Sequence, residues 1–289
     1  MRVRVWGARG SIPSPGPETI RYGGNTSCVQ VTMSDGHHLV LDAGTGIRNL
    51  GTLLDEPGAH IHILLTHLHL DHIQGLLFFS PLFRRQAHVT IWGPAAPGGT
   101  LQERISRYLS APLTPVEVRE LPCELDFLDC PATEWDIGPA RIRAEAVNHR
   151  GPTLGFSITD SGRSVCYIPD HEPALAGPVG KLEPQWISGY SLAQGADLLI
   201  HDCQYTDGEY ASHVGWGHSA LDDALNFARR ADAGRTLLFH HDPYHSDEQL
   251  DRLLVVASQR WEELGGAAGA IAMAAEGTEI EVATSSAPA

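Results

Sequence analysis

Apolar and polar residues alternate along the chain in patterns typical of strands and amphipathic helices. Short apolar or alternating runs predict strands at 3–6, 28–33, 38–41, 61–65, 88–92, 116–121, 142–147, 155–159, 164–168, 196–203, 236–239, 271–273 and 279–282. Apolar residues at helical spacing predict helices at 73–79, 101–109, 221–231 and 246–264. Ser246 and Gln249 form a capping-box pattern at the start of the last helix. Strands mixed with helices predict an α/β or α+β fold.

Turn residues separate the predicted strands. Ser34-Asp35-Gly36 joins the second and third strands of an expected antiparallel N-terminal sheet, and Asp160-Ser161-Gly162 has the composition of a hairpin turn. We expect the strands at 271–273 and 279–282 to close a second sheet. The composition does not change between the two halves, so we expect one domain over residues 1–289, with a frayed Ala- and Ser-rich C-terminal end.

Composition and charge restrict the class of protein. A hydrophobic content of 42% and a charged content of 19% fit a soluble globular chain. The start alternates like a strand and no long apolar segment follows, so we expect neither a membrane span nor a signal peptide, and a cytoplasmic location. The net charge, 20 − 35 = −15, disfavours long nucleic acid as a partner but is compatible with a small anionic substrate beside metal ions. A homodimer is compatible with the sequence.

The cysteines are odd in number and form no C-x-x-C pair, which disfavours a disulfide framework or a thiolate zinc site. We expect them to be buried reduced thiols. They are Cys28, Cys123, Cys130, Cys166 and Cys203.

Four metal-capable side chains lie within six positions after an apolar run, in His67-Leu68-His69-Leu70-Asp71-His72. Residues i and i+2 of an extended chain point the same way, so His67 and His69 are expected to bind one ion together. Asp71 and His72 lie where the chain enters the next helix and are expected to face a second ion. Asp71 is also placed to orient a water molecule. The pattern predicts a metal site.

This H-x-H-x-D-H pattern resembles that of the metallo-β-lactamase superfamily of hydrolases. Similar motifs run from Trp6-Gly7-Ala8-Arg9-Gly10-Ser11 through Gly23-Gly24-Asn25-Thr26-Ser27 to His240-His241. The resemblance implies a four-layer αββα sandwich with a dinuclear metal site in a cleft at one edge. It also implies the full ligand set His67, His69, Asp71, His72, His149, Asp170 and His240, with Asp170 bridging the two ions.

Two residues beside these motifs, His241 and Asp42, are not assigned as metal ligands. His240 directly follows an apolar run and matches the family position of the last ligand, whereas His241 points to the other side of an extended chain. Asp42 is a candidate to hydrogen-bond a metal-ligating histidine.

His218 and Asp202 resemble the histidine and acidic pair of the phosphodiesterase branch that includes ribonuclease Z. Asp202 stands where the transfer-RNA-processing enzymes usually have glutamate. The resemblance implies that His218 protonates a leaving alkoxide or contacts a phosphoryl oxygen. The structural alternative is that His218 only caps the following helix.

The resemblance implies a dinuclear hydrolase that acts through a metal-bridging hydroxide. Imidazole and carboxylate ligands suit two divalent ions, with zinc expected and manganese or iron as alternatives. Only 20 residues separate His149 from Asp170, which leaves no room for a long arm that grasps transfer RNA. We therefore expect a phosphodiesterase acting on small phosphodiesters or cyclic nucleotides. The alternatives are lactone, thioester or β-lactam hydrolysis, an RNA-processing nuclease, and a non-catalytic metal-binding module.

Overall fold

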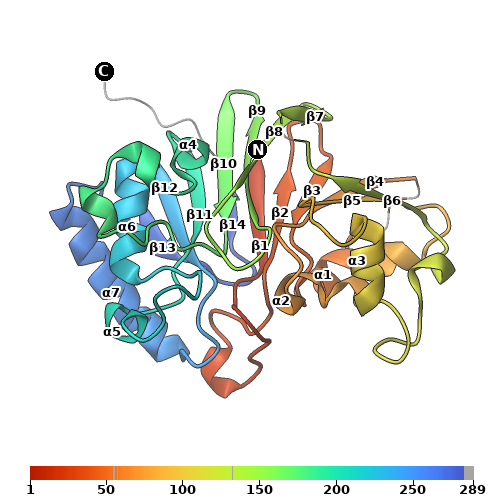
Figure 1. Cartoon of the computed structure of the whole chain (residues 1–289), viewed down its shortest axis with the longest axis horizontal. Helices are drawn as coiled ribbons and strands as arrows, with labels where there is room; N and C mark the ends of the chain where they lie inside the picture. The colour runs from red at the N-terminus through yellow and green to blue at the C-terminus, as the bar shows by residue number, and fades with distance from the viewer. Residues whose placement is uncertain (55, 57, 132, 283–289) are drawn as a thin grey trace.

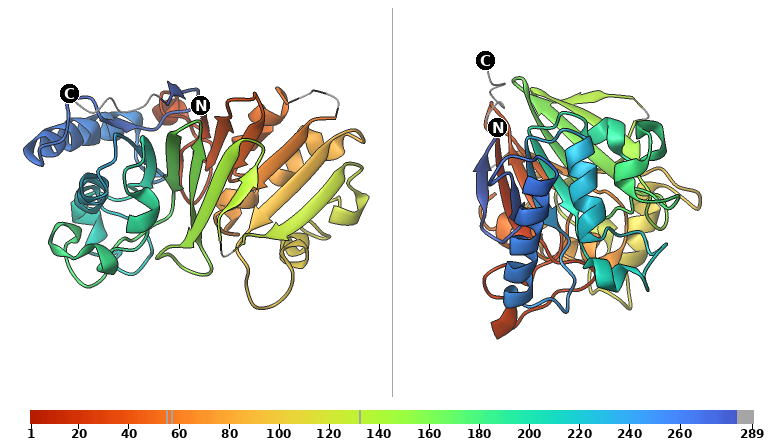
Figure 2. Two further views of the ribbon diagram at one scale, coloured as in Figure 1. Left: turned by 90° about the horizontal axis from the view of Figure 1, so that it is seen from above. Right: turned by 90° about the vertical axis from the view of Figure 1, so that its left-hand side faces the viewer.

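Two stacked β-sheets lie between two layers of helices in the computed structural model (Figure 1). The structure describes residues 1–54, 56, 58–131 and 133–282. Helices α6 and α7 cover one sheet, and α1 and α3 cover the other; Figure 2 gives the same arrangement from two further directions. The expected four-layer αββα sandwich is confirmed.

The first sheet has the strand order β14-β1-β2-β3-β4-β5-β6. The pairs among β14, β1, β2 and β3 are antiparallel, which confirms the expected N-terminal sheet, and β3 to β6 are parallel. The strands are β1 (Arg2–Gly7), β2 (Cys28–Thr32), β3 (His38–Leu41), β4 (His60–Leu64), β5 (His88–Gly93), β6 (Glu124–Asp129) and β14 (Glu279–Glu281).

The second sheet has the strand order β13-β12-β11-β10-β9-β8-β7. Strands β10 to β13 are parallel to one another, so their carboxyl ends meet at one edge of the sheet. The strands are β7 (Trp135–Ile137), β8 (Ala140–Ala146), β9 (Leu154–Asp160), β10 (Arg163–Ile168), β11 (Leu198–Asp202), β12 (Arg235–Phe239) and β13 (Ile271–Met273).

The helices are short except for α7, where Ser246 and Gln249 form the expected capping box. They are α1 (Ile47–Gly51), α2 (Leu70–Ile73), α3 (Leu101–Tyr108), α4 (Tyr190–Ala193), α5 (Asp207–Tyr210), α6 (Leu221–Arg230) and α7 (Asp247–Glu263). Short 3-10 helices are η1 (Pro17–Thr19), η2 (Leu76–Phe78), η3 (Ser80–Phe83), η4 (Val118–Glu120), η5 (Val179–Lys181) and η6 (Pro184–Trp186).

Three apolar clusters hold the layers together. One lies between the sheets and contains alternate residues of facing strands, such as Val29 and Val31 of β2 and Ile158 of β9. The second lies between the first sheet and its helices, and the third lies between the second sheet and α4, α6 and α7. Burial of both faces of each sheet holds the strand ends, and thus the loops that follow them, in fixed positions.

Two predicted elements are wrong in position or type. The helix expected at 73–79 is instead α2, which begins at Leu70, followed by η2 and η3. Gly75 lies between α2 and η2. The chain passes so close to Gly44 at this point that any side chain would meet the Gly44 carbonyl oxygen. The strand expected at 116–121 is η4, in which Glu117 and Glu120 form a reciprocal cap.

Three further details differ from the sequence expectations. Strands β6 and β7 were not predicted, and the alternation of acidic and apolar residues in β6 is the signal that identifies it. The strand at 279–282 is β14, which pairs with β1 and therefore belongs to the first sheet rather than the second. Cys123 and Cys130 are partly exposed, whereas the other cysteines are buried.

The hairpin turn at residues 160–162 and the turn at residues 34–36 lie where expected. The C-terminal end, for which we expected fraying, lies outside the described residues from position 283 onward. No helix within the described ranges is both long and apolar enough to cross a membrane.

Candidate metal centre

The side chains of the predicted ligand set meet at one edge of the sandwich, at the lower side of Figure 1 where α2 lies. The chain after β4 and the start of α2 contribute four of them, and the turn between β8 and β9 contributes His149. Asp170 follows β10 and His240 follows β12, so the parallel strands bring these two residues to the same edge. All predicted ligands are therefore adjacent, and their binding of metal stays a prediction.

Asp170 lies between two groups of candidate ligand atoms, and in each group these atoms lie within 4.8 Å of one another. Its Oδ2 atom lies 3.7 Å from His67 Nε2 and 3.6 Å from His149 Nε2. Its Oδ1 atom lies 3.0 Å from His72 Nε2 and 3.2 Å from His240 Nε2. One carboxylate thus directs one oxygen toward each group. The groups are His67, His69, His149 and Asp170, and Asp71, His72, Asp170 and His240.

Asp42 fixes the rings of two histidines, that of His72 directly and that of His67 through Thr66. Its carboxylate accepts a hydrogen bond from His72 Nδ1 at 2.8 Å, and it also accepts from the Thr66 hydroxyl. Since the Thr66 proton is given to Asp42, His67 Nδ1 donates to Thr66 Oγ1 at 3.0 Å. Tyr167 donates a further hydrogen bond to Asp42 at 2.9 Å. Both histidines are thereby held in the tautomer whose Nε2 carries no proton and faces the other candidate ligands; Nε2 of His67 lies 2.8 Å from Nδ1 of His69. The expected hydrogen bond between Asp42 and a candidate ligand is present, and the binding of metal by that histidine stays a prediction.

Two more histidines are oriented in the same way. His149 Nδ1 donates to the carbonyl oxygen of Gly217 at 2.7 Å, and His240 Nδ1 donates to Gln204 Oε1 at 3.0 Å. His241 points away from the centre and donates from Nε2 to the carbonyl oxygen of Ala274 at 2.8 Å. The two adjacent histidines thus face opposite sides, as expected, but the physical reason differs, because the backbone at His240 is left-handed with a φ of 59° and not extended.

The donor atoms fit divalent metal ions. His72 Nε2 and Asp170 Oδ1 are buried and have no hydrogen-bond partner within the described part of the chain, an arrangement that costs free energy unless another group satisfies both atoms. Burial opposes ionisation of Asp170, but the histidines around it hold the pKa of its carboxyl well below its usual range. Imidazole nitrogen and carboxylate oxygen are ligands that zinc, manganese and iron all accept.

Asp202, the last residue of β11, is saturated with hydrogen bonds. Its Oδ2 atom accepts from His218 Nδ1 at 2.7 Å and from the His171 backbone N–H at 2.9 Å. Its Oδ1 atom accepts from the backbone N–H groups of Gln204 and Ser219 at 2.9 and 3.2 Å. These contacts fix the carboxylate, which in turn fixes the His218 ring.

His218 lies beside both groups of candidate ligands. Its ring stacks on the ring of His240 with the centroids 4.9 Å apart, and the ring of His149 lies at the same distance of 4.9 Å. Burial lowers the pKa of His218, but the Asp202 carboxylate outweighs burial and raises this pKa to about 9. Helix α6 has Ala220 as its N-cap and no side-chain cap, so His218 does not cap the helix.

Glu172 holds the segment that carries His218. This carboxylate is only 2% exposed and accepts hydrogen bonds from the backbone N–H groups of Gly215 and Gly217, both at 2.8 Å. It also accepts from the Tyr210 hydroxyl at 2.7 Å. The Gly217 carbonyl in turn accepts a hydrogen bond from the His149 ring. Glu172 therefore holds the segment before His218 and also helps to orient the candidate ligand His149.

The N-terminal motif closes the other side of the centre. The Ser11 backbone N–H donates to Asp71 Oδ2 at 2.8 Å. A side chain at Gly10 would lie 2.4 Å from Nδ1 of His240, so glycine is needed for this close approach. The Arg9 guanidinium is fully buried and donates to backbone carbonyls of the loop that follows His240.

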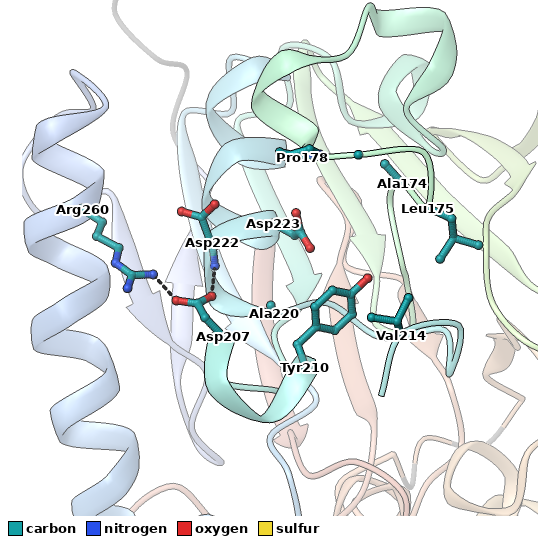
Figure 3. A pocket seen from close by; sticks show the side chains of 11 residues that line it. Ala174, Leu175, Pro178, Asp207, Tyr210, Val214, Ala220, Asp222, Asp223 and Arg260 are labelled. Atoms are coloured by element: carbon teal, nitrogen blue, oxygen red, sulfur yellow. Dashed lines mark hydrogen bonds and ion pairs between the residues drawn. The ribbon is translucent and has the colours of Figure 1, made fainter. Parts of the chain in front are cut away.

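One cavity lies beside the segment that carries His218, and another lies at the ligand cluster. A cavity of 540 Å³ lies between α5 and α6 and is lined by Tyr210, Val214, Asp222 and Asp223 (Figure 3). It lies behind Glu172 rather than at the ligand cluster, since Tyr210 reaches from its wall to that carboxylate. A second cavity, of 340 Å³, is lined directly by His67 and His69.

Sequence reasoning missed several residues that orient the centre. Glu172 and Gln204 each lie two positions after a predicted site residue, Asp170 and Asp202, and polar residues at this spacing after a strand end are a usable signal. Tyr167 gave no such signal, because it reads as an apolar strand residue whose hydroxyl reaches Asp42 across 125 positions of sequence.

The family model described as the beta-lactamase superfamily domain matches residues 37–241. Ribonuclease Z of Gemmatimonas aurantiaca is 27% identical over 323 aligned positions, which cover 97% of this chain and 96% of that protein.

Two solved structures have the same fold. The metallo-β-lactamase fold protein YhfI from Bacillus subtilis has a TM-score of 0.70 at 20% identity, covering 97% of this chain and 99% of that chain. The short form of human tRNase Z has a TM-score of 0.67 at 23% identity, covering 98% of this chain and 100% of that chain. With the family match extending over more than half of the sequence, the chain belongs to the metallo-β-lactamase superfamily, and ribonuclease Z proteins are among its relatives.

Proposed function

We propose that the protein is a metal-dependent phosphodiesterase that cleaves a nucleotide phosphodiester, with the end of an RNA chain as the first candidate substrate. The observation that carries the proposal is the hydrogen-bonded pair of Asp202 and His218 beside the two groups that share Asp170. The ribonuclease Z relatives support an RNA substrate better than the cyclic nucleotides expected from sequence alone.

The two groups around Asp170 are the proposed metal sites. His67, His69 and His149 would hold one ion, Asp71, His72 and His240 would hold the other, and Asp170 would bridge them. Two divalent ions at such a centre lower the pKa of a water molecule toward neutrality and neutralise charge on the phosphate. Zinc is the first candidate, because imidazole ligands predominate over carboxylates.

His218 is proposed to deliver a proton to the leaving oxygen. Its Nδ1 is occupied by Asp202, so Nε2 is the nitrogen available to the substrate. The Asp202 carboxylate keeps the proton of Nδ1 in place and favours the charged form of the ring, the same role that a carboxylate plays beside other catalytic histidines. The alkoxide released from a nucleotide is a poor leaving group. Protonation of its oxygen makes it a better one, and His218 can supply that proton.

The second candidate substrate is a small phosphodiester such as a cyclic nucleotide. The short connection between His149 and Asp170 and the net charge of −15 both favour a compact anionic substrate over a long RNA. An RNA substrate must therefore be bound near its cleaved end, with few contacts to the rest of the molecule. Lactone, thioester and β-lactam hydrolysis remain the competing reactions on the same residues.

A hydrolysis screen of protein loaded with zinc or manganese tests the proposal. The substrates are bis-p-nitrophenyl phosphate, a cyclic nucleotide, a short RNA with an unpaired trailing end, a lactone and a β-lactam. We expect hydrolysis of the phosphodiesters and, among them, trimming of the RNA end. Cleavage of the lactone or β-lactam without any phosphodiester would reject the proposed function, and cleavage of the cyclic nucleotide without RNA would favour the second candidate.

A further inference from the structure

The cavity of 340 Å³ beside the candidate metal centre has the size of a small-ligand site, for which volumes of roughly 300–1,000 Å³ are typical. His67, Leu68 and His69 line one part of it. Its other walls come from three places, the chain after β5, helix α3 and the turn that follows His149. The wall residues are Pro94, Ala96, Pro97, Arg104, Arg150, Gly151 and Pro152. An occupant would therefore lie directly beside the first group of ligand atoms.

Helix α3 holds the proline-bearing wall in place. Arg104 Nη2 donates to the carbonyl oxygen of Pro94 at 2.7 Å, and Arg107 Nη2 donates to that of Gly98 at 2.8 Å. The Arg104 side chain is only 10% exposed. Among the residues that the structure describes, its Nε atom has no hydrogen-bond partner, and its one carboxylate contact, with Asp129, is long at 3.5 Å. The wall is thus formed before any ligand arrives, and it places a weakly paired guanidinium at the cavity.

Arg150, in the turn that follows His149, supplies a second guanidinium to the lining. It directly follows the candidate ligand His149 and is exposed, and its Nε atom donates to the carbonyl oxygen of Gly215 at 3.4 Å. Within residues 1–54, 56, 58–131 and 133–282, no carboxylate forms an ion pair with Arg150. In a chain with a net charge of −15, an arginine left free of acidic partners beside the centre is available for an anionic, planar ligand.

Trp216 lies close to Arg150, although it does not line the cavity itself. It follows Gly215, the residue that Arg150 contacts, and its indole is 53% exposed. The edge of the ring is held by His213, with the centroids 4.8 Å apart and the planes at 80°. An exposed indole that a neighbour holds in one orientation is suited to stacking on a planar group.

We infer that this cavity, with Arg150 in its lining and Trp216 next to the Gly215 carbonyl that Arg150 contacts, binds the nucleoside attached to the phosphate that is cleaved. Guanidinium planes and indole rings stack on nucleobases, and the proline walls offer apolar contact to the base and sugar. A simple alkyl phosphodiester would leave these surfaces unused. The inference rests on the proposed function and adds to it a specificity site for one nucleoside.

Two esters with the same leaving group test the inference. The p-nitrophenyl ester of uridine monophosphate carries the nucleoside, and methyl p-nitrophenyl phosphate does not. We expect the wild type to prefer the uridine ester in kcat/KM. Arg150→Ala and Trp216→Ala are each expected to reduce this preference about 5- to 150-fold, the range for loss of one stacked base. Trp216→Phe should retain most of the preference, because phenylalanine can also stack.

Arg235→Ala is the matched control. This exposed arginine begins β12, at the opposite end of the strand from His240, and its removal should leave the preference unchanged. Equal losses on both esters in the Arg150 and Trp216 variants would overturn the inference while leaving the phosphodiesterase proposal intact.

A binding measurement separates the two proposals. Calorimetry should detect uridine monophosphate binding to the metal-loaded wild type more tightly than ribose phosphate binding, and Arg150→Ala should remove that difference. Hydrolysis of neither ester would reject the proposed function, whereas the calorimetric result would still decide whether the cavity recognises a nucleoside. Equal binding of the two phosphates by the wild type would overturn the inference.

Discussion

Asp202 Oδ2 lies 2.7 Å from His218 Nδ1, and the same carboxylate accepts three backbone hydrogen bonds. The imidazole is therefore bound to a carboxylate that cannot easily move. Asp202 ends a central strand of the second sheet, and His218 precedes α6, so the pair depends on the packing of α6 against β11. A histidine held in this way can deliver a proton with little reorganisation.

Replacement of His218 tests that role. His218→Ala should lower turnover of alkyl phosphodiesters about 100- to 10,000-fold, the range for loss of a general acid. The loss should be smaller for p-nitrophenyl esters, whose leaving group scarcely needs a proton. Steady-state kinetics with both substrates, elemental analysis and thermal melting measure the effect.

His37→Ala is the control for that experiment, since His37 is an exposed residue of the turn between β2 and β3. Equal losses on both substrates would indicate that His218 stabilises a phosphoryl oxygen instead. No loss on either substrate would contradict a catalytic role.

Asp170 should determine the metal stoichiometry. Because one of its oxygens faces each group, Asp170→Ala should reduce the metal content from about two ions per chain to one or fewer. Elemental analysis of dialysed protein measures this directly, with Asp126→Ala on the exposed face of β6 as the control. An unchanged content of one ion in both wild type and variant would contradict a dinuclear centre.

The adjacent residues His240 and His241 should behave differently. His240→Ala should lose metal, because its Nε2 atom lies 3.2 Å from both Asp71 and Asp170. His241→Ala should keep its metal but lose about 1–3 kcal/mol of stability, because the buried carbonyl of Ala274 loses its hydrogen-bond donor. Metal analysis and denaturant unfolding distinguish the two, and metal loss only in the His241 variant would reverse the assignment.

The four candidate ligands between His67 and His72 could be predicted because their chemistry is local and their spacing follows the backbone, whereas His149, Asp170 and His240 were assigned through the family resemblance. His67 and His69 share a side of an extended segment, His240 directly follows β12, and Asp170 lies two residues after the end of β10; both strands were correctly identified. Strand ends are easily found where the preceding residues are fully apolar. The positions of these residues in the sandwich then follow from parallel strand pairing.

The supporting contacts could not be predicted, because they join distant parts of the sequence. The contact between Ser11 and Asp71 spans 60 positions, and Glu172 reaches Gly217 across 45 positions. The placement of β14 beside β1 was missed for a similar reason, since strand alternation shows that a strand exists but does not identify its partner. The segment around Val118 also alternates, so it was predicted as a strand, but it forms the 3-10 helix η4.

Glu172 should affect catalysis without binding metal or substrate. Glu172→Gln replaces one carboxylate oxygen by an N–H₂ group, which cannot accept a hydrogen bond. The backbone N–H of either Gly215 or Gly217 therefore loses its acceptor. We expect activity to fall about 10- to 100-fold, as for other residues that orient ligands from behind. Tyr210→Phe removes only one of the three hydrogen bonds and should cause a smaller loss.

The dependence on leaving group separates positioning from general damage to the fold. If Glu172 acts through His218, Glu172→Gln should affect alkyl esters more than p-nitrophenyl esters, as His218→Ala does. A uniform loss accompanied by a lower melting temperature would indicate a purely structural role.

Asp223, which lines the cavity in Figure 3, should make the protein less stable as pH rises. Burial, with the nearby carboxylates of Asp222, Asp207 and Glu172, raises the pKa of Asp223 from 3.8 to about 6, although the Val179 backbone N–H opposes the shift. Between these two pH values the folded state binds more protons than the unfolded state, so stability falls as pH rises from about 4 to about 6 and stays lower above that range.

Asp223→Asn should therefore remove this part of the pH dependence. Asparagine can still accept the Val179 hydrogen bond but carries no charge, so the variant should melt at a higher temperature than the wild type at pH values above the folded pKa. Below the unfolded pKa, where Asp223 is protonated in both states, the difference should be small. Asp232→Asn, at a side chain that is 88% exposed, is the control and should leave the profile unchanged. Melting curves that shift equally at all pH values in Asp223→Asn would show that the carboxylate is not the cause.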